Sequence, residues 1–303
     1  MPIAESALVA GKIVPDAPAR RRGVPVTTVR ELVEVAARGW PAVETERLGG
    51  WTLRASAPER PGSPAAGDSA PGGPGPVDEA RPALREGFTA RANSVLPLGD
   101  PGLPQDEAVA TAQRWYEERG LVPRVQVTTG GERTDELLAA ELERRGWSGE
   151  RYALLRIAAL APLADREPDH RVRLSRAPDA GWLSLHPRAG KLPDAALKVL
   201  TGGPSVWFAT VPGDSGSGTP GAIGRCVIDG RWAGFAAIEV APGRRREGLA
   251  TAVMAELARE ALAEGASAAY LQVESDNAAA RALYDGLGFA DHHAYHYRRA
   301  PGS

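Results

Sequence analysis

The sequence holds a single cysteine, Cys226, and only three lysines among its 36 basic residues. One cysteine excludes a disulfide within the chain, which fits a reducing compartment, and we expect a cytoplasmic protein. We interpret Cys226 as a small apolar residue inside a strand rather than as a nucleophile.

A surplus of charge and long apolar runs are also missing. The formal net charge is −2, so we expect neither nucleic acid nor a membrane surface as a partner. No apolar run approaches the length that crosses a bilayer, and the N-terminus lacks the apolar core of a secretion signal. Apolar residues make up 43% and charged residues 24%, as in a globular protein, and 303 residues predict two domains.

Composition also suggests where the chain divides. Residues 1–25 show no periodicity and predict a flexible tail, and the Pro-, Gly-, Ala- and Ser-rich residues 55–87 predict a disordered insert. Residues 161–170, with two prolines, are the expected linker between domains at 26–160 and 171–303. Apolar periodicity predicts helices at 29–38, 105–119, 135–145, 179–185, 194–200, 249–264 and 278–287, and strands at 51–54, 88–96, 124–127, 151–160, 171–174, 206–211, 222–228, 232–240, 270–273 and 293–298.

The two halves repeat one order of elements. Gln126-Val127 and Gln272-Val273 each lie in a strand after a helix, and Gly146-Trp147 and Gly288-Phe289 each follow the next helix. This similarity predicts two copies of one unit.

A stretch in the second copy has the chemistry of a diphosphate site. Pro242 ends the strand at 232–240, and Gly248 and Ala250 remove side-chain bulk where the next helix begins. A helix start carries unpaired N–H donors and the positive end of the dipole, which suit a phosphate. Three arginines, Arg244 to Arg246, add permanent charge beside it.

Two motifs in this region resemble those of one family. Arg245-x-x-Gly248-x-Ala250 is similar to the acetyl-CoA loop, Arg/Gln-x-x-Gly-x-Gly/Ala, of the GNAT superfamily of N-acetyltransferases. The stretch Asn277-x-x-Ala280-x-x-Leu283-Tyr284-x-x-x-Gly288-Phe289 resembles the family's C-terminal motif in the family's order. The resemblance implies the α/β (α+β) GNAT fold, a mixed and mostly antiparallel sheet flanked by helices. It covers residues 171–299 well, and the N-terminal copy is interpreted as degenerate, because Asp100-Pro-Gly-Leu-Pro104 stands where the acetyl-CoA loop would lie.

The resemblance also implies the residues that bind acetyl-CoA, the expected co-substrate. The positions that match the family's contacts are Ile238, Val240, Arg245, Arg246, Glu247, Gly248, Leu249, Ala250, Thr251, Asn277 and Ala280. Asn277 also fits a plain helix N-cap, and both roles are compatible.

Two residues are the expected catalytic groups. Tyr284 lies seven residues after Asn277, on the same helical face, and would donate a proton to the leaving thiolate; the alternative is a core aromatic. An amine with a pKa near 10 must lose a proton before it attacks, and Glu239 is the expected base; a solvated strand glutamate is equally consistent. Backbone N–H near Val240 would polarise the acetyl carbonyl, so direct transfer needs no covalent enzyme intermediate.

We therefore expect an acetyl-CoA-dependent N-acetyltransferase that acts on a small-molecule or peptide amine, with no metal. Arg91, Asn93 and Trp51 are candidate acceptor contacts, and His292, His293 and His296 are interpreted as surface residues rather than metal ligands. The alternatives are a non-catalytic acyl-CoA-binding sensor or scaffold and a mycothiol-synthase-like acetyltransferase. Internal duplication makes a monomer plausible.

Overall fold

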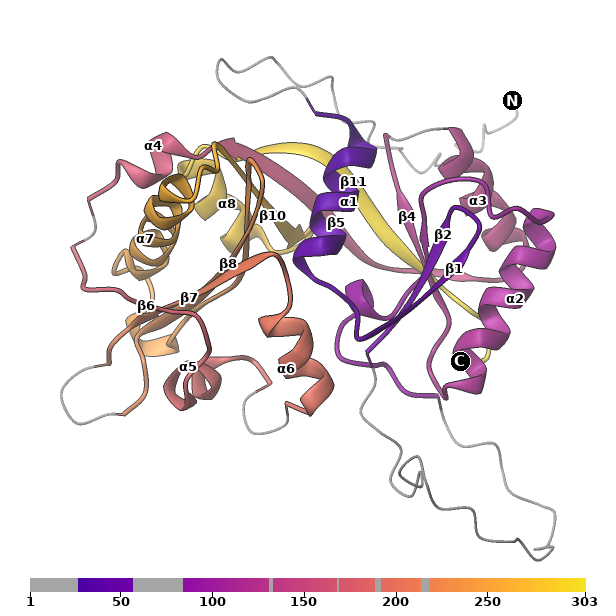
Figure 1. Cartoon of the computed structure of the whole chain (residues 1–303), viewed down its shortest axis with the longest axis horizontal. Helices are drawn as coiled ribbons and strands as arrows, with labels where there is room; N and C mark the ends of the chain where they lie inside the picture. The colour runs from indigo at the N-terminus through magenta and orange to yellow at the C-terminus, as the bar shows by residue number, and fades with distance from the viewer. Residues whose placement is uncertain (1–26, 57–83, 131–132, 168, 189–191, 214–217) are drawn as a thin grey trace, which may run out of the picture.

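The computed structural model describes residues 27–56, 84–130, 133–167, 169–188, 192–213 and 218–303 (Figure 1). The expected tail and most of the expected insert, residues 57–83, lie outside them. The helices are α1 (Val29–Gly39), α2 (Gln105–Glu118), α3 (Arg133–Arg144), α4 (Ala161–Ala164), α5 (Ala180–Leu185), α6 (Asp194–Thr201), α7 (Leu249–Ala263) and α8 (Ala278–Gly286), with 3₁₀ turns η1 (Ala90–Ala92) and η2 (Pro242–Arg244). The strands are β1 (Glu44–Leu48), β2 (Trp51–Ala55), β3 (Leu96–Pro97), β4 (Arg124–Thr128), β5 (Ser148–Ala159), β6 (Arg173–Ser175), β7 (Ser205–Val211), β8 (Ala222–Asp229), β9 (Trp232–Val240), β10 (Ala268–Glu274) and β11 (Ala290–Arg299).

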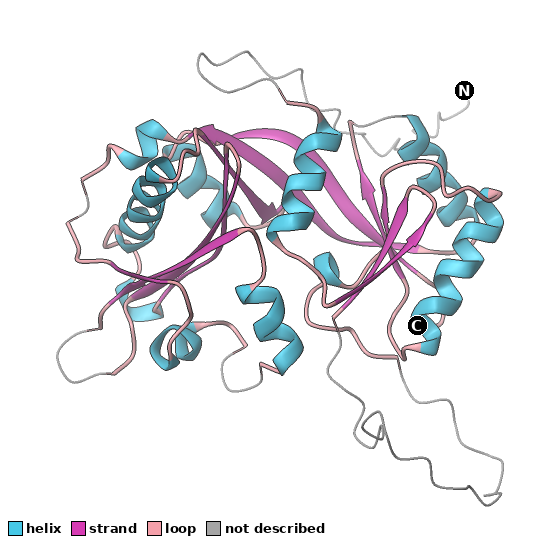
Figure 2. Cartoon of the chain, viewed as in Figure 1, coloured by secondary structure: helices cyan, strands magenta, loops and turns pink. Residues whose placement is uncertain are grey.

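Two sheets organise the described residues. The smaller has the order β1-β2-β3, and the larger has the order β4-β11-β5-β10-β9-β8-β7-β6. All neighbours in the larger sheet are antiparallel except β9 and β10, which are parallel. Helices lie on both of its faces (Figure 2). The expected fold class, a mixed and mostly antiparallel sheet flanked by helices, is confirmed.

The two copies exchange their last strands. Each copy runs through three antiparallel strands, a helix, a strand, a helix and a final strand. However, β4 pairs with β11 rather than β5, and β10 pairs with β5 rather than β11. β5 and β11 also pair with each other, and they cross the middle of the molecule side by side (Figure 1). The two halves of the chain therefore share one sheet, while the division at residues 161–170 stays a prediction.

Different helices bury the two faces of β7–β10. On one face α7 places Val253, Leu257 and Ala261 in a fully buried apolar cluster, against which side chains of α8 pack. On the other face Leu32 of α1 and Leu200 of α6 share a cluster with Trp182 of α5. Thus α1, the first described helix, lies against strands from the far end of the chain (Figure 1).

A third cluster fills the N-terminal copy. Ala108, Ala112, Trp115 and Tyr116 of α2 are buried in it, as the helical periodicity predicts. Leu138 and Leu142 of α3 and residues of β2 and β4 complete it. No described helix has the length and apolarity needed to span a bilayer.

Most expected elements are confirmed to within a few residues at their ends. The expected strand at 88–96 is wrong, because this segment contains η1 and only β3 at its end. The Asn93 amide donates to the carbonyl of Thr89, and the Ser94 hydroxyl donates to that of Ala90. Such local bonds compete with a strand ladder. β1 was not expected, because four of its five residues are exposed and its sequence does not alternate.

Candidate active site

The parallel strands β9 and β10 separate at one end. Their pairing runs from Trp232–Ala268 to Phe235–Leu271 and then stops, although both strands continue. The backbone of Ile238 and Val240 consequently has no strand neighbour on the β10 side. The amide of Ala241, one residue further, donates to the carbonyl of Gly221, the residue that precedes β8. Successive N–H groups of an extended strand point to opposite sides, so the Val240 amide points into the gap.

A β-bulge sets which side chains of β9 face which side. Ile223 pairs with Glu239 and Arg225 with Ala236, so β9 has one extra residue, and Ala237 takes a φ of +51°. The bulge reverses the alternation. Ile238 packs with α7, on the same face as Phe235, and Glu239 consequently points to the opposite face.

Glu239 and Tyr284 interact electrostatically. Burial raises the pKa of the Glu239 carboxyl, and the positive charge of Arg245 opposes that rise. Burial also raises the pKa of Tyr284 to about 12, and the negative charge of Glu239 acts in the same direction. Tyr284 therefore keeps its proton at neutral pH, and Glu239 is shifted toward the pH range in which a base works.

The start of α7 leaves several amides open. Gly248 precedes the helix with a φ of +81°, a conformation that L side chains rarely adopt. The first helical bond recorded beyond it runs from Ala252 to the Gly248 carbonyl. Among the described residues, the amides of Gly248, Leu249, Ala250 and Thr251 donate to no acceptor. The first turn also contains no acidic residue.

The loop before α7 is exposed and charged. Arg245, Arg246, Glu247 and Gly248 are all exposed, and Leu249 is buried in the core below them. The Glu247 carboxylate pairs with Arg244 at 2.6 Å, so its negative charge is compensated within the loop. Exposed arginines beside unpaired amides form a surface suited to a diphosphate.

Asn277 is the N-cap of α8, as the sequence predicted for one of its two roles. Its side-chain oxygen accepts from the Ala280 amide at 3.0 Å, so its amide nitrogen is the part left for a ligand. Asn277 and Ala280 both line a cavity of about 420 Å³, together with Ile238, Glu239 and Tyr284. The structure thus brings both expected catalytic residues to the gap between β9 and β10. Four of the expected acetyl-CoA contacts lie there too: Ile238, Asn277 and Ala280 line the cavity, and Val240 lies beside it.

The N-terminal copy has a cavity of its own, but the start of its corresponding helix is acidic. This second cavity, about 290 Å³, is lined by the ends of β3 and β4 and by the first residues of α1. The helix that would carry the loop, α2, is preceded by Pro104, and its first turn contains Asp106 and Glu107. Two carboxylates at a helix start repel a phosphate, so the chemistry favours the cavity at β9 and β10.

The sequence did not reveal Arg156 of β5 as part of the site. Its guanidinium donates to the carbonyls of Arg281 and Phe289 and pairs with Asp285 and Asp291. It thus fixes α8, and with it Tyr284, to a strand from the other copy. The signal was present in the sequence, because Arg156 is the only charged residue in the apolar run 153–160.

Of the three candidate acceptor contacts, only Arg91 lines the cavity. Trp51 is wrong, because it is 3% exposed within the core of the N-terminal copy. Asn93 is also wrong: it is buried and bonded to Ser56 and Thr89. Trp51 packs in the apolar core, and Asn93 forms hydrogen bonds with the backbone, so neither side chain is available to a ligand.

The remaining candidates of the sequence have structural roles. Cys226 is fully buried in β8, and burial raises the pKa of its thiol to about 12, so the interpretation as an apolar strand residue is confirmed. The expectation that the three histidines lie on the surface is wrong for His293, which is 7% exposed. Burial lowers the pKa of His293 to about 3. His292 lies within hydrogen-bond distance of it.

Comparison with known proteins agrees with this architecture. A family model described as "Probable histone acetyltransferase Rv0428c C-terminal" matches residues 82–298. The chain is 24% identical to the uncharacterized N-acetyltransferase YobR of Bacillus subtilis (strain 168) over 279 residues, 89% of this chain and 98% of that protein.

Solved structures share the fold. A GCN5-related N-acetyltransferase from Kribbella flavida superposes with a TM-score of 0.59 over 92% of this chain and 98% of its own, at 13% identity. A tandem GNAT protein from the clavulanic acid biosynthesis pathway has a TM-score of 0.55 over 68% of this chain and 74% of its own, at 15% identity.

The matched family model and the N-acetyltransferase relative identify a GNAT-type acetyltransferase, an acyltransferase enzyme, and the fold agrees with this class. Within that superfamily the chain belongs to the family of the matched Rv0428c-type model, which covers more than two thirds of it.

Proposed function

We propose that the protein transfers the acetyl group of acetyl-CoA to a primary amine by direct attack. The observation that carries the proposal is the combination of open amides at the start of α7 with the unpaired edge of β9. The amides of residues 248–251 suit the diphosphate, and the backbone of Ile238 and Val240 suits the pantetheine arm. Asn277 and Ala280 would contact the same arm from α8.

Glu239 is proposed to prepare the amine for attack. An alkylammonium has a pKa near 10 and must lose a proton before its nitrogen can attack. Burial raises the pKa of the Glu239 carboxyl toward neutral pH, so its carboxylate can accept that proton directly or through a water. The bulge at Ala237 turns Glu239 to the face opposite α7, which supports entry of the amine from that side.

Tyr284 is proposed to act on the leaving sulfur. As the nitrogen–carbon bond forms, the carbon–sulfur bond breaks and negative charge develops on sulfur. The Tyr284 hydroxyl, which stays protonated because its pKa is raised, would donate to it. The Val240 N–H would polarise the acetyl carbonyl. Cys226 takes no part, because it is fully buried as a neutral thiol.

The acceptor is proposed to be an amine on a small molecule or a peptide. The name of the matched family model points to a histone for that family, and the name of the Bacillus subtilis relative gives no acceptor.

The test measures release of the CoA thiol when acetyl-CoA and amines are mixed with the purified protein. Tyr284→Phe is expected to lower kcat by about 10²- to 10⁴-fold, the range of general acid–base catalysis, with little change in acetyl-CoA affinity. Tyr152→Phe is the control, because Tyr152 is 54% exposed and does not line the cavity. Tight acetyl-CoA binding without transfer to any amine would instead support an acyl-CoA sensor.

A further inference from the structure

Several arginines near the cavity have only neutral partners. Arg54 donates to the Ser94 carbonyl, the Ser94 hydroxyl and the Gln126 side chain. Arg225 donates to the carbonyls of Leu200 and Gly202. Arg91 donates to the Gln272 side chain at 2.7 Å. Within the described part of the chain, none of the three forms an ion pair with a carboxylate, although buried charges are usually paired.

Arg91 is the member that a ligand can reach. It is half-buried on the wall of the cavity and lies over the Trp40 ring at 4.2 Å. A guanidinium has five N–H donors, and the Gln272 oxygen takes one of them, so several remain for a planar anion. The Trp40 ring packs against the guanidinium and limits its movement.

Arg54 and Arg225 add fixed positive charge behind Arg91. Both are almost fully buried, and burial lowers the pKa of each, to about 10 for Arg225, so both remain protonated at neutral pH. Two small cavities of about 10 Å³ extend from Arg91 and Gln272, one to Arg54 and the other to Arg225. Each has room for about one water molecule or one carboxylate oxygen.

A buried hydroxyl lacks a partner on the same wall. Tyr297 lines the cavity and is 3% exposed, and its oxygen has no hydrogen-bond partner among the described residues. The charges of Arg54, Arg91 and Arg151 act on it and lower its pKa against the larger effect of burial. An unsatisfied buried hydroxyl in a positive environment is a further sign of an absent polar ligand.

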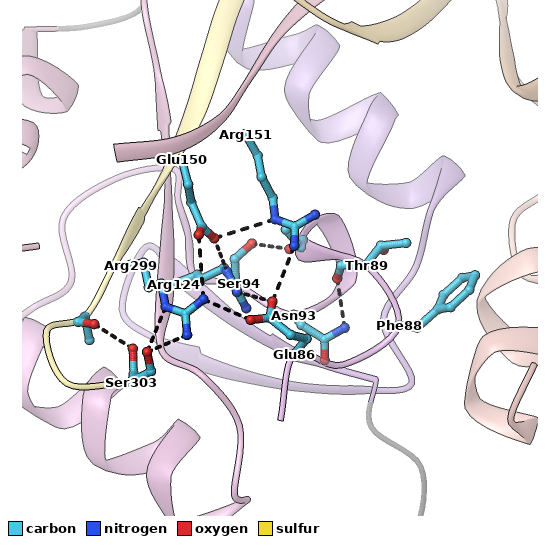
Figure 3. Close-up of polar contacts among 12 residues, drawn as sticks. Glu86, Phe88, Thr89, Asn93, Ser94, Arg124, Glu150, Arg151, Arg299 and Ser303 are labelled. Carbon is cyan, nitrogen blue, oxygen red and sulfur yellow. Dashed lines mark hydrogen bonds and ion pairs between the residues drawn. The ribbon is translucent and has the colours of Figure 1, made fainter. Parts of the chain in front are cut away.

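Arg151 at the same cavity serves as a contrast. It pairs with Glu86 at 3.4 Å and with Glu150 at 3.6 Å, within a network that also holds Arg124 and Arg299 (Figure 3). Its charge is already compensated by protein carboxylates, so the uncompensated positive charge on the cavity wall lies on Arg91 and on Arg188, whose guanidinium donates to the Phe88 carbonyl.

This positive site is separate from the proposed diphosphate site. Gln272, the partner of Arg91, alternates with Leu271 and Val273, which face α7, so it points to the α1 face. Arg225 likewise follows Gly224, whose missing side chain makes room for Val253 of α7. The open amides belong to α7, whereas the three arginines lie on the face from which the amine is proposed to enter.

We propose that the acceptor is an amine that also carries a carboxylate, and that Arg91 binds this carboxylate. The inference rests on the proposed function and narrows its acceptor class to amino acids and related amino carboxylates. A lysine-rich peptide is disfavoured, because its positive charges would meet Arg91, Arg54 and Arg225. Arg91 is thus a specificity-determining residue rather than an acid or a base.

The experiment compares matched acceptors with the full-length protein and acetyl-CoA. Free amino acids and straight-chain amino carboxylates are each paired with the corresponding carboxamide, and a lysine-rich peptide with a blocked C-terminus is the third class. The carboxylates are expected to have a kcat/KM about 10- to 100-fold above their carboxamides. Arg91→Gln should remove this preference by raising KM for the carboxylate, with the KM for acetyl-CoA unchanged. Arg91→Lys should restore part of it.

Arg176→Gln is the matched control. Arg176 lies over the Trp207 ring at 3.6 Å, as Arg91 lies over Trp40, but it pairs with Glu264 away from the cavity. The Arg176→Gln variant should keep the preference for carboxylates over carboxamides. Transfer to carboxamides or to the peptide at rates equal to or above those of the carboxylates would overturn the inference and leave the acetyltransferase proposal standing. Absence of transfer to every acceptor would remove both.

Discussion

At the scale of single residues, the site depends on how burial changes acid–base behaviour. Tyr284 and Glu239 are both partly buried, and burial disfavours the charged form of each, so the pKa of each is raised. The consequences differ. The tyrosine is held as a proton donor at any physiological pH, whereas the glutamate is moved toward the pH at which it can exchange a proton with an amine. One physical effect therefore supplies an acid and a base.

Glu239→Gln should change the pH profile of transfer. Because Glu239 must be ionised to act as a base, log kcat/KM of the natural protein should fall more steeply below its raised pKa, by up to about one further unit per pH unit. The Gln variant should be slower at neutral pH and should lack this additional acid limb. Rates measured with one amine from pH 5 to pH 9 would check this; identical profiles for both proteins would exclude Glu239 as the base.

The same substitution should affect stability in a defined direction. The folded-state pKa of Glu239 is raised, so the ionised carboxylate destabilises the fold above that pKa and the penalty disappears as pH falls. Glu239→Gln should therefore raise Tm at neutral pH, and the difference should shrink on acidification. Thermal unfolding at several pH values measures both trends.

At the scale of elements, a helix start and a strand irregularity position the chemistry. Gly248 lets the chain enter α7 with a left-handed residue, which leaves the following amides pointing outward. The extra residue at Ala237 reverses the faces of β9, so Ile238 anchors in the α7 core while Glu239 reaches the other side. Neither feature contributes a reactive side chain of its own.

Gly248→Ala should weaken the binding of the acetyl-CoA diphosphate. A φ of +81° costs a non-glycine residue about 1–2 kcal/mol, so the turn is expected to shift and misdirect the amides. We expect KM for acetyl-CoA to rise about 10-fold, the size of a lost hydrogen bond to a charged group, with little change for S-acetylpantetheine, which lacks the diphosphate. Steady-state kinetics with both donors test this.

Gly265→Ala is the control for that substitution. Gly265 follows the other end of α7 with a φ of +94°, and a Cβ there would also meet nothing within 4 Å. It imposes a comparable backbone strain on the same helix, far from the open amides. Equal effects of the two variants on KM would show that the loss came from α7 as a whole and not from its start.

At the scale of the whole molecule, the exchange of β5 and β11 joins the two copies. β10 pairs with β5 at seven positions, and β5 also pairs with β11. Arg156 of β5 holds α8, which carries Tyr284. The N-terminal copy, which lacks a loop for a diphosphate, thus completes the sheet of the copy that has one.

The two halves should consequently fail to fold independently. A fragment of residues 161–303 would expose the edges of β10 and β11 that β5 covers, and open edges favour association. We expect this fragment to be unfolded or aggregated, and the full chain to unfold in urea in one transition seen alike by fluorescence and circular dichroism. Co-expression of residues 1–160 with the fragment should restore a soluble complex. A monomeric, active fragment would contradict the exchange as a requirement for folding.

Much of this protein could be derived from the sequence because the relevant signals are local. Helical periodicity located α2, α7 and α8, and Asp229-Gly230 between apolar runs located the β8–β9 hairpin. The glycine and the arginines at the start of α7 could be recognised from their spacing within a few residues. The same holds for Asn277 and Tyr284, which are seven residues, or about two helical turns, apart. Their placement around one cavity follows from the family pattern.

Only the tertiary structure decided which copy supplies each central strand and which arginines lack a carboxylate. The continuous apolar run of β5 and the mostly polar sequence of β11 do not select a neighbouring strand, so strand pairing had to be settled by long-range packing. Arg54, Arg91 and Arg225 come from segments distant in the chain, and an arginine has the same charge wherever it stands. Whether that charge is compensated depends on what folding places beside it, because Coulomb interactions act through space and not along the sequence.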